Sequence, residues 1–246
     1  MLTELAKVPV FSIEDVEKIK KNKSTAYSQL SRFIDKGKVK KIRNNLYSLV
    51  NPITGQMVAN RYQIACAISD TAYLSHHSAF EYYGFANQVY NEVYVSSETR
   101  FNSFEYDNIT YKYVASRMAE GVVVAKNTTG VRITDIERTI IDSIHDLNKI
   151  AGLEELLNCL EGVRFLNEDK LRLYLDHYDT QGLYQKTGFL LGQLTVSNDF
   201  IEFCHSKIGK SKKYLITETK GSSYYNREWN LMVPRIMFEP TEKSGC

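Results

Sequence analysis

The chain of 246 residues is 43% hydrophobic and 24% charged, which excludes wholesale disorder and allows one large domain or two modest ones. Its apolar runs are far too short to span a bilayer, and its four scattered cysteines form no C-x-x-C pair, so we expect a cytoplasmic protein with reduced thiols. The net charge of +2 is uneven, because residues 1–50 contain eleven Lys and Arg but five Asp and Glu. A basic end on a slightly acidic body is expected where that end meets a polyanion.

The first fifty residues predict three short helices followed by a hairpin. Helices are expected over about 1–7, 13–21 and 24–36, and strands over 39–43 and 46–50. Ser12 and Asp15 form a capping-box pattern at the second helix, Ser24 is the expected cap of the third, and Gly37 follows its end. Asn44-Asn45 can adopt the positive φ angles of a two-residue turn. This order of elements is that of a winged helix-turn-helix.

A turn-rich segment around Pro52 and Gly55 predicts a domain boundary, with a DNA-binding domain over 1–53 and a larger mixed domain over 54–246. The expected fold class is therefore α+β. The remaining expected elements are helices over about 58–69 and 76–83, antiparallel strands within 89–114, short strands over 121–125 and 131–133, a helix opened by a Thr134–Glu137 capping box, several helices within 153–208, and an extended tail over 214–238.

The third predicted helix carries the strongest functional signal. Residues 18–43 hold ten Lys and Arg with Asp35 as the only acid, and phosphate neutralisation is the main sequence-independent source of DNA affinity. At 100° per residue, Thr25, Ser28 and Arg32 lie opposite the apolar face, in the part of a recognition helix that reaches base edges. The predicted DNA-contacting residues are Lys23, Ser24, Thr25, Ser28, Arg32, Lys36, Lys38, Lys40, Lys41, Arg43, Asn44 and Asn45. The alternative is a solvated basic face on a module that binds protein or RNA.

Four stretches of the sequence together resemble the AbiEi-type antitoxins, often described as transcriptional regulators of viral defence. They are NLYSL at 45–49, YLSHHSAFEYYG at 73–84, ITDIERTIID at 133–142 and YNREWNLMVP at 225–234. They span most of the chain in the order found in the family. One departure is visible at the wing turn, where the family usually has Gly before the Tyr and this chain has Asn44-Asn45-Leu46.

The resemblance implies two roles in a type IV toxin–antitoxin, or abortive infection, system. The winged helix would bind inverted repeats in the promoter of its own operon and repress it. Because a single small module neutralises few phosphates, we also expect two copies to pair on the DNA. The larger domain would counter a toxin of the nucleotidyltransferase class without forming a stable complex with it. The matching residues that would carry the antitoxin role are Ser75, His77, Ser78, Arg138 and Asp142. No catalytic residue, metal or cofactor is expected.

Several side-chain groups allow other interpretations. His77 and Glu81 have the i, i+4 spacing of metal ligands but lack a third ligand nearby, and Ser75 is explained more simply as a helix cap. Arg138 and Asp142 can organise the core of the larger domain. The lysines from Lys207 to Lys213 form a second basic cluster, either a solvated loop or an auxiliary nucleic-acid contact.

Two rival functions stay open at this point. One is a divergent nuclease or nucleotidyltransferase, although Gly221-Ser222-Ser223, which is similar to the start of a nucleotidyltransferase signature, lacks the spaced Asp-x-Asp downstream. The other is a ligand-responsive repressor without a toxin partner.

Overall fold

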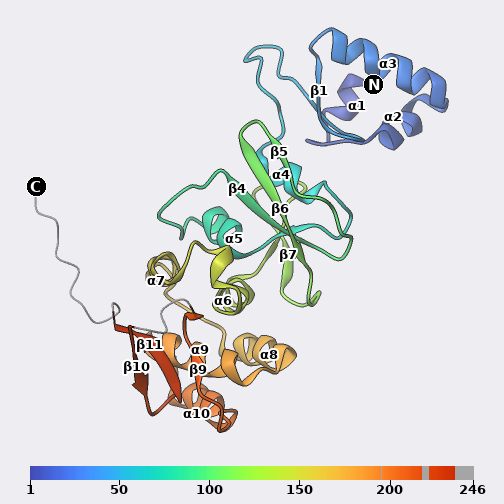
Figure 1. Cartoon of the computed structure of the whole chain (residues 1–246). Coiled ribbons are helices and arrows are strands. Elements are labelled where there is room, and N and C mark those ends of the chain that lie inside the picture. The colour runs from blue at the N-terminus through green and yellow to red at the C-terminus, as the bar shows by residue number, and fades with distance from the viewer. Residues whose placement is uncertain (195, 218–221, 236–246) are drawn as a thin grey trace, which may run out of the picture. The chain divides into compact units, whose positions relative to one another are not determined.

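The computed structural model describes residues 1–194, 196–217 and 222–235, which form an α+β protein of two compact units (Figure 1). Unit 1 comprises residues 1–84 and 88–135, and unit 2 comprises 85–87 and the described residues from 136 on. The boundary expected at 53/54 therefore falls inside unit 1. No helix among the described residues is both long and apolar enough to cross a membrane.

Unit 1 begins with three helices and a hairpin, in the order expected from the sequence. They are α1 (Leu2–Leu5), α2 (Ile13–Lys20), α3 (Lys23–Asp35), β1 (Val39–Arg43) and β2 (Leu46–Leu49). The capping box of Ser12 and Asp15 is confirmed at α2. The expected Ser24 cap is wrong, because α3 begins one residue earlier and Asn22 accepts the Thr25 N–H at 3.0 Å. In the turn, only Asn45 has a positive φ, of 57°, and the β1–β2 register shifts beside it.

The hairpin β1–β2 contributes to two hydrophobic cores in unit 1. Val39 and Tyr47 belong to a small core that α1, α2 and α3 complete. Ile42 and Leu46 belong to a second core shared with the following helices and sheet. Successive strand residues point to opposite faces, so the same short hairpin can bury side chains on both sides. This arrangement explains why residues 1–50 belong to the same unit as the second core.

The rest of unit 1 is a six-stranded sheet in the order β5-β6-β4-β3-β8-β7, contacted by two helices (Figure 1). Its elements are α4 (Arg61–Cys66), β3 (Tyr73–Leu74), α5 (His76–Tyr83), β4 (Glu92–Ser97), β5 (Phe104–Tyr106), β6 (Ile109–Ala115), β7 (Val122–Val124) and β8 (Arg132–Thr134). The expectation of antiparallel strands within 89–114 holds for β5–β6 but is wrong for β4–β6, which are parallel. The reason is that β5 reverses the chain on the outer side of β6, so β6 runs in the direction of β4.

Unit 2 consists of helices and a three-stranded sheet in the order β10-β11-β9. Its elements are α6 (Ile136–His145), a 3-10 turn (Leu147–Lys149), α7 (Leu153–Glu161), α8 (Glu168–Tyr178), α9 (Gln181–Leu191), α10 (Asn198–Ser206), β9 (Lys213–Tyr214), β10 (Ser223–Asn226) and β11 (Leu231–Pro234). The helices expected within 153–208 are confirmed. Of the residues singled out in the sequence, Gly221, Cys246 and the tail from 236 on lie outside the described residues.

The capping box expected from Thr134 to Glu137 lies where β8 passes into α6. Thr134 ends β8, where its hydroxyl donates to the Leu74 carbonyl at 3.4 Å, and α6 begins only at Ile136. The Glu137 carboxylate accepts the Asn167 N–H at 2.9 Å. Glu137 therefore ties α6 to the start of α8.

Close packing between α9 and the β10–β11 turn depends on a glycine. Gly188 lies in the interior of α9 beneath Trp229, whose side chain is 5% exposed. A Cβ at position 188 would lie 2.0 and 2.1 Å from two ring carbons of Trp229. The sole tryptophan is therefore a packing anchor of unit 2.

We expect Gly188→Ala to destabilise the protein by about 1–3 kcal/mol, because the clash with Trp229 outweighs the helix-propensity gain of alanine. Gly182→Ala on the same helix is the control, since its Cβ would meet only the Lys213 side chain, at 3.5 Å or more. Urea unfolding followed by tryptophan fluorescence measures both. Equal stability of the two variants contradicts this packing.

Candidate nucleic-acid interface

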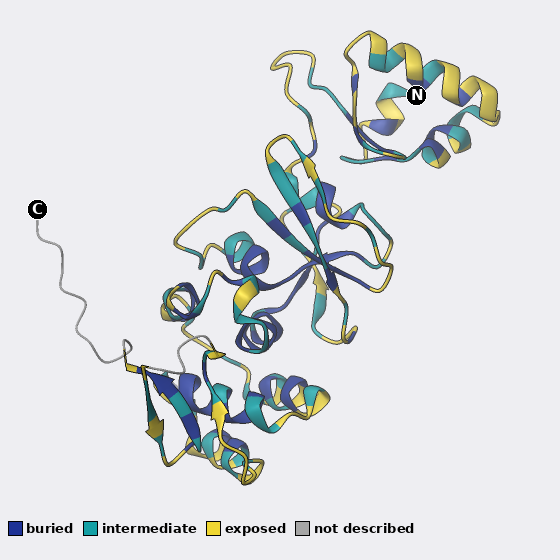
Figure 2. Ribbon diagram, in the orientation of Figure 1, coloured by how far each residue is buried: buried dark blue, intermediate teal, exposed yellow. Residues whose placement is uncertain are grey.

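Helix α3 separates an apolar face from a polar one. Ala26 and Leu30 are buried against the small core of unit 1, whereas Thr25, Ser28 and Arg32 are exposed. Figure 2 shows that α3 carries both buried and exposed stretches along its ribbon. The Ser28 hydroxyl donates to the Thr25 carbonyl at 3.2 Å, which leaves its oxygen able to accept a hydrogen bond. Within unit 1, the structure therefore brings the three predicted base-reading residues together on one uncovered face.

The cations around this face lack acidic partners. Among the described residues, no carboxylate forms an ion pair with any Lys or Arg from Lys20 to Arg43. Lys18, which precedes this range on α2, pairs with Asp15 at 3.2 Å. Unpaired cations on one surface raise the local potential and attract phosphates. The exposed predicted contacts are Lys23, Ser24, Thr25, Ser28, Arg32, Lys36, Lys38, Lys40, Lys41 and Asn44.

Arg43 is placed differently from the other predicted contacts. Its guanidinium carbon lies 4.6 Å from the ring centroid of Phe104 and 5.9 Å from that of Phe101. Both distances are in the range of cation–π contacts. Arg43 thus packs against unit 1's sheet region and is partly buried, in contrast to the exposed Lys40 and Lys41 on the same strand.

Asn45 holds the hairpin turn against α2. Its side-chain oxygen accepts the Ile13 N–H at 2.9 Å, and its amide donates to the Glu14 carboxylate at 2.7 Å. This hydrogen bond from Asn45 is the main reason that the pKa of Glu14 is lowered. The left-handed φ of Asn45 is one that asparagine tolerates well. Asn45 is therefore a positioning residue for the hairpin.

Sequence reasoning missed Tyr27, which lies on α3 with half of its surface exposed. The same 100° rotation that groups Thr25, Ser28 and Arg32 places Tyr27 at the edge of the apolar face. A large aromatic left half-exposed beside a basic surface can stack on or pack against a nucleic acid.

Three further candidates, Ser75, His77 and Ser78, are buried in unit 1 at the start of α5. Ser75 occupies the cap position, but its side chain makes no capping hydrogen bond; its hydroxyl lies 2.7 Å from that of Ser96. The Ser78 hydroxyl accepts the Tyr94 N–H at 2.8 Å. Both serines therefore join α5 to β4, and the expected capping role of the Ser75 side chain is wrong.

His77 and Glu81 belong to a network of buried polar groups. Nδ1 of His77 lies 3.8 Å from Oε2 of Glu81, and Oε1 of Glu81 accepts the Tyr62 hydroxyl at 2.5 Å. Burial, with this hydrogen bond, raises the pKa of Tyr62. Arg61 lies 3.4 Å from the same carboxylate oxygen. The described residues contain no cluster of three or more His, Cys, Asp or Glu placed to hold a metal ion.

The remaining two candidates, Arg138 and Asp142, form a buried ion pair in unit 2. The side chains are 1% and 3% exposed, and Nε of Arg138 lies 2.7 Å from Oδ1 of Asp142. The Tyr178 hydroxyl donates to the same oxygen at 2.6 Å. The pair therefore links α6 to α8 inside unit 2, whereas Ser75, His77 and Ser78 lie in unit 1.

The second basic cluster is divided among different partners. Lys207 pairs with Asp176 at 3.1 Å, and the Lys212 ammonium lies 4.6 Å from the Tyr225 ring centroid. Lys210 is exposed, and Lys213 lies in β9.

Comparisons with known proteins identify a similar fold but no family. Neither the protein-family models nor the curated proteins include a match to this chain. The crystal structure of RV2827C protein from Mycobacterium tuberculosis is similar, with a TM-score of 0.66 and 13% identity over 91% of this chain and 86% of that chain. At this identity the likeness concerns the fold alone.

We expect Asp142→Ala to lower the free energy of unfolding by about 3–5 kcal/mol, because it removes the buried carboxylate that Nε of Arg138 and the Tyr178 hydroxyl contact. The control is Glu137→Ala, which removes a longer contact of 3.8 Å to the partly exposed Lys170 and one backbone hydrogen bond, and should cost less. Urea unfolding followed by circular dichroism measures both. A smaller loss for Asp142→Ala than for Glu137→Ala contradicts the buried pair as the main α6–α8 link.

Proposed function

We propose that this chain is a DNA-binding transcriptional regulator whose residues 1–50 act as a winged helix-turn-helix. The observation that carries the proposal is the group of cations around the exposed face of α3 formed by Thr25, Ser28 and Arg32, for which the described residues supply no carboxylate partner. If the basic surface were only solvated, the short polar residues Thr25 and Ser28 on that face of the helix would have no explanation. Duplex DNA matches both the charge and the shape.

In this proposal α3 enters the major groove and the hairpin follows the backbone. Arg32 donates two hydrogen bonds to a guanine, and Ser28 and Thr25 contact neighbouring bases or phosphates. Lys40 and Lys41 neutralise phosphates beside the groove. Because one small module contacts few phosphates, two copies bind two half-sites of an inverted repeat in the chain's own promoter.

The antitoxin role is a second part of the proposal and is supported by the resemblance alone. Two of the stretches that resemble AbiEi-type antitoxins contain the buried polar groups at His77 and Asp142. Such residues fit a structural role in each unit. By the resemblance, the chain counters a nucleotidyltransferase-class toxin without forming a stable complex with it.

The DNA-binding proposal predicts two distinct mutational effects. The double variant Lys40→Ala/Lys41→Ala should weaken binding to all sequences alike, since phosphate contacts are independent of sequence. Arg32→Ala should cost about 1–3 kcal/mol on the preferred site and relax the preference at one base pair. Gel shifts on promoter and scrambled duplexes measure both effects.

Lys18→Ala is the matched control for these gel shifts. Lys18 lies on α2 and pairs with Asp15, so its loss should leave DNA binding close to that of the natural protein. If Lys18→Ala and Lys40→Ala/Lys41→Ala bind equally well, the hairpin is not part of the interface.

The antitoxin part predicts that a variant can lose promoter repression and still rescue the growth of cells that express the toxin. The full-length triple variant Arg32→Ala/Lys40→Ala/Lys41→Ala should lose promoter repression yet still rescue growth of cells that express the neighbouring toxin. Reporter expression and growth are measured in the same strains. Failure of the unmodified chain to rescue growth would leave a plain repressor and remove this part of the proposal.

A further inference from the structure

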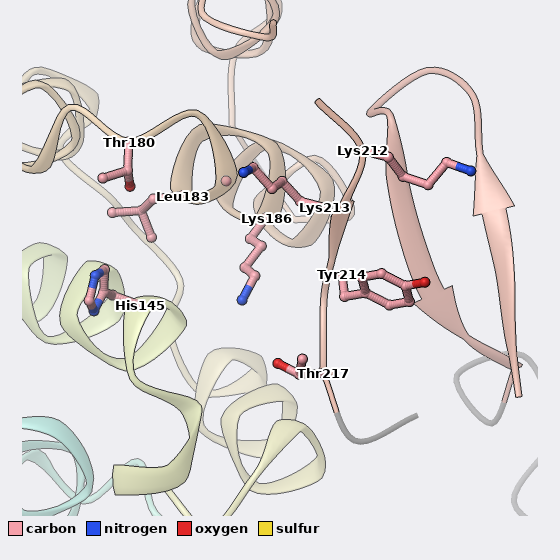
Figure 3. Close-up of a pocket in the computed structure, with 9 residues that line it drawn as sticks. His145, Thr180, Leu183, Lys186, Lys212, Lys213, Tyr214 and Thr217 are labelled. Atoms are coloured by element: carbon pink, nitrogen blue, oxygen red, sulfur yellow. The ribbon is translucent and has the colours of Figure 1, made fainter. Parts of the chain in front are cut away.

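A cavity of about 420 Å³ lies in unit 2 between the start of α9, the end of α6 and the strand β9 (Figure 3). Three lysines, one histidine and two threonines are among the nine described residues that line it, and none of the nine is acidic. The lining residues are His145, Thr180, Gly182, Leu183, Lys186, Lys212, Lys213, Tyr214 and Thr217.

The lining side chains come from elements that packing holds in place. Thr180 is the cap residue of α9, and Leu183 and Lys186, spaced by three residues, share one face of that helix. Figure 3 shows Lys186 pointing into the space between His145 and Thr217. The stem of Lys213 runs over Gly182, where a Cβ would lie 3.5 Å from its Cγ. The ammonium of Lys213 is thereby kept beside the first turn of α9.

An aspartate next to this cavity contacts one of its lining residues. Oδ1 of Asp146 lies 2.8 Å from Nδ1 of His145, and its other oxygen contacts Lys149. Asp146 lines a neighbouring cavity of about 330 Å³, which shares His145, Lys186 and Thr217 with the first. Because the Lys212 ammonium lies over the Tyr225 ring, the lysine charge in the first cavity comes from Lys186 and Lys213. None of its nine described lining residues is acidic.

We propose that this cavity binds a small phosphate-bearing anion of mononucleotide size. Ammonium groups and hydroxyl donors are the groups that proteins use for phosphate oxygens, and cations in a recess attract such an anion more strongly than on a flat surface. A cavity of this volume lies in the range of small-molecule sites. The site is separate from the α3 surface and does not depend on DNA binding.

The test is isothermal titration calorimetry on the full chain with pyrophosphate and with ATP. We expect one saturable site, and Lys186→Met and Lys213→Met should each weaken it by about 10- to 100-fold, the loss expected for a hydrogen bond to a charged group. Lys210→Met is the matched control, because Lys210 is exposed in the same cluster and does not line the cavity. Lys40→Ala/Lys41→Ala controls for anions bound at the α3 surface. Both controls should bind as the unmodified chain does.

The probes distinguish what is recognised. Equal affinity for pyrophosphate and ATP identifies the phosphates as the ligand, and tighter ATP binding adds the nucleoside; both support the site. The absence of saturable binding at millimolar concentrations overturns the proposal. Unchanged anion binding in the folded Lys186→Met and Lys213→Met variants also overturns it. If a Met variant fails to fold, Lys186→Gln takes its place. The proposal is also overturned if a single-stranded oligonucleotide binds through these lysines while neither small anion does.

Discussion

The hairpin β1–β2 must pack on two hydrophobic cores at once, and the position of the basic surface depends on this constraint. Val39 and Tyr47 complete the core beneath α3, while Ile42 and Leu46 join the core of the six-stranded sheet. Asn45 then fixes the turn to the first residues of α2. Since the hairpin has packed side chains on both of its faces, its exposed Lys40 and Lys41 and the polar face of α3 belong to one continuous scaffold. Such rigidity suits recognition of a duplex, whose groove spacing is fixed.

Polar groups play two physically different roles in this chain. On α3 and the hairpin, every Lys and Arg except Arg43 is exposed, and none has an acidic partner in the described part of the chain, so the exposed ones are available to an external polyanion. At Glu81 and Asp142, charges are buried and each carboxylate is in contact with an arginine and a tyrosine hydroxyl. Buried charges without partners are strongly destabilising, which accounts for these networks. The stretches that resemble a known family thus include residues that pack each unit as well as residues on its surface.

Features set by neighbouring residues could be predicted from the sequence, and features set by distant ones could not. The Ser12 capping box and the strands of the hairpin follow from local spacing and turn chemistry. By contrast, the sequence around Arg43 predicts a phosphate contact, because nothing nearby indicates that the fold brings Phe104, some sixty residues later, against its guanidinium. The parallel pairing of β4 with β6 depends on a strand order that side-chain alternation does not encode. The exposed face of α3 was predictable because helical periodicity alone separates Thr25, Ser28 and Arg32 from Ala26 and Leu30.

The central claim is that the unpaired cations of α3 and the hairpin replace counterions on duplex DNA. The dependence of the binding constant on salt concentration tests it most directly, because each neutralised phosphate contributes a slope of about −0.9 in a plot of log K against log salt. The account predicts a linear plot whose slope corresponds to about four to six phosphates for each bound copy, made shallower by about two phosphates in Lys40→Ala/Lys41→Ala. A binding constant that does not change with salt, or an unchanged slope in that variant, contradicts it.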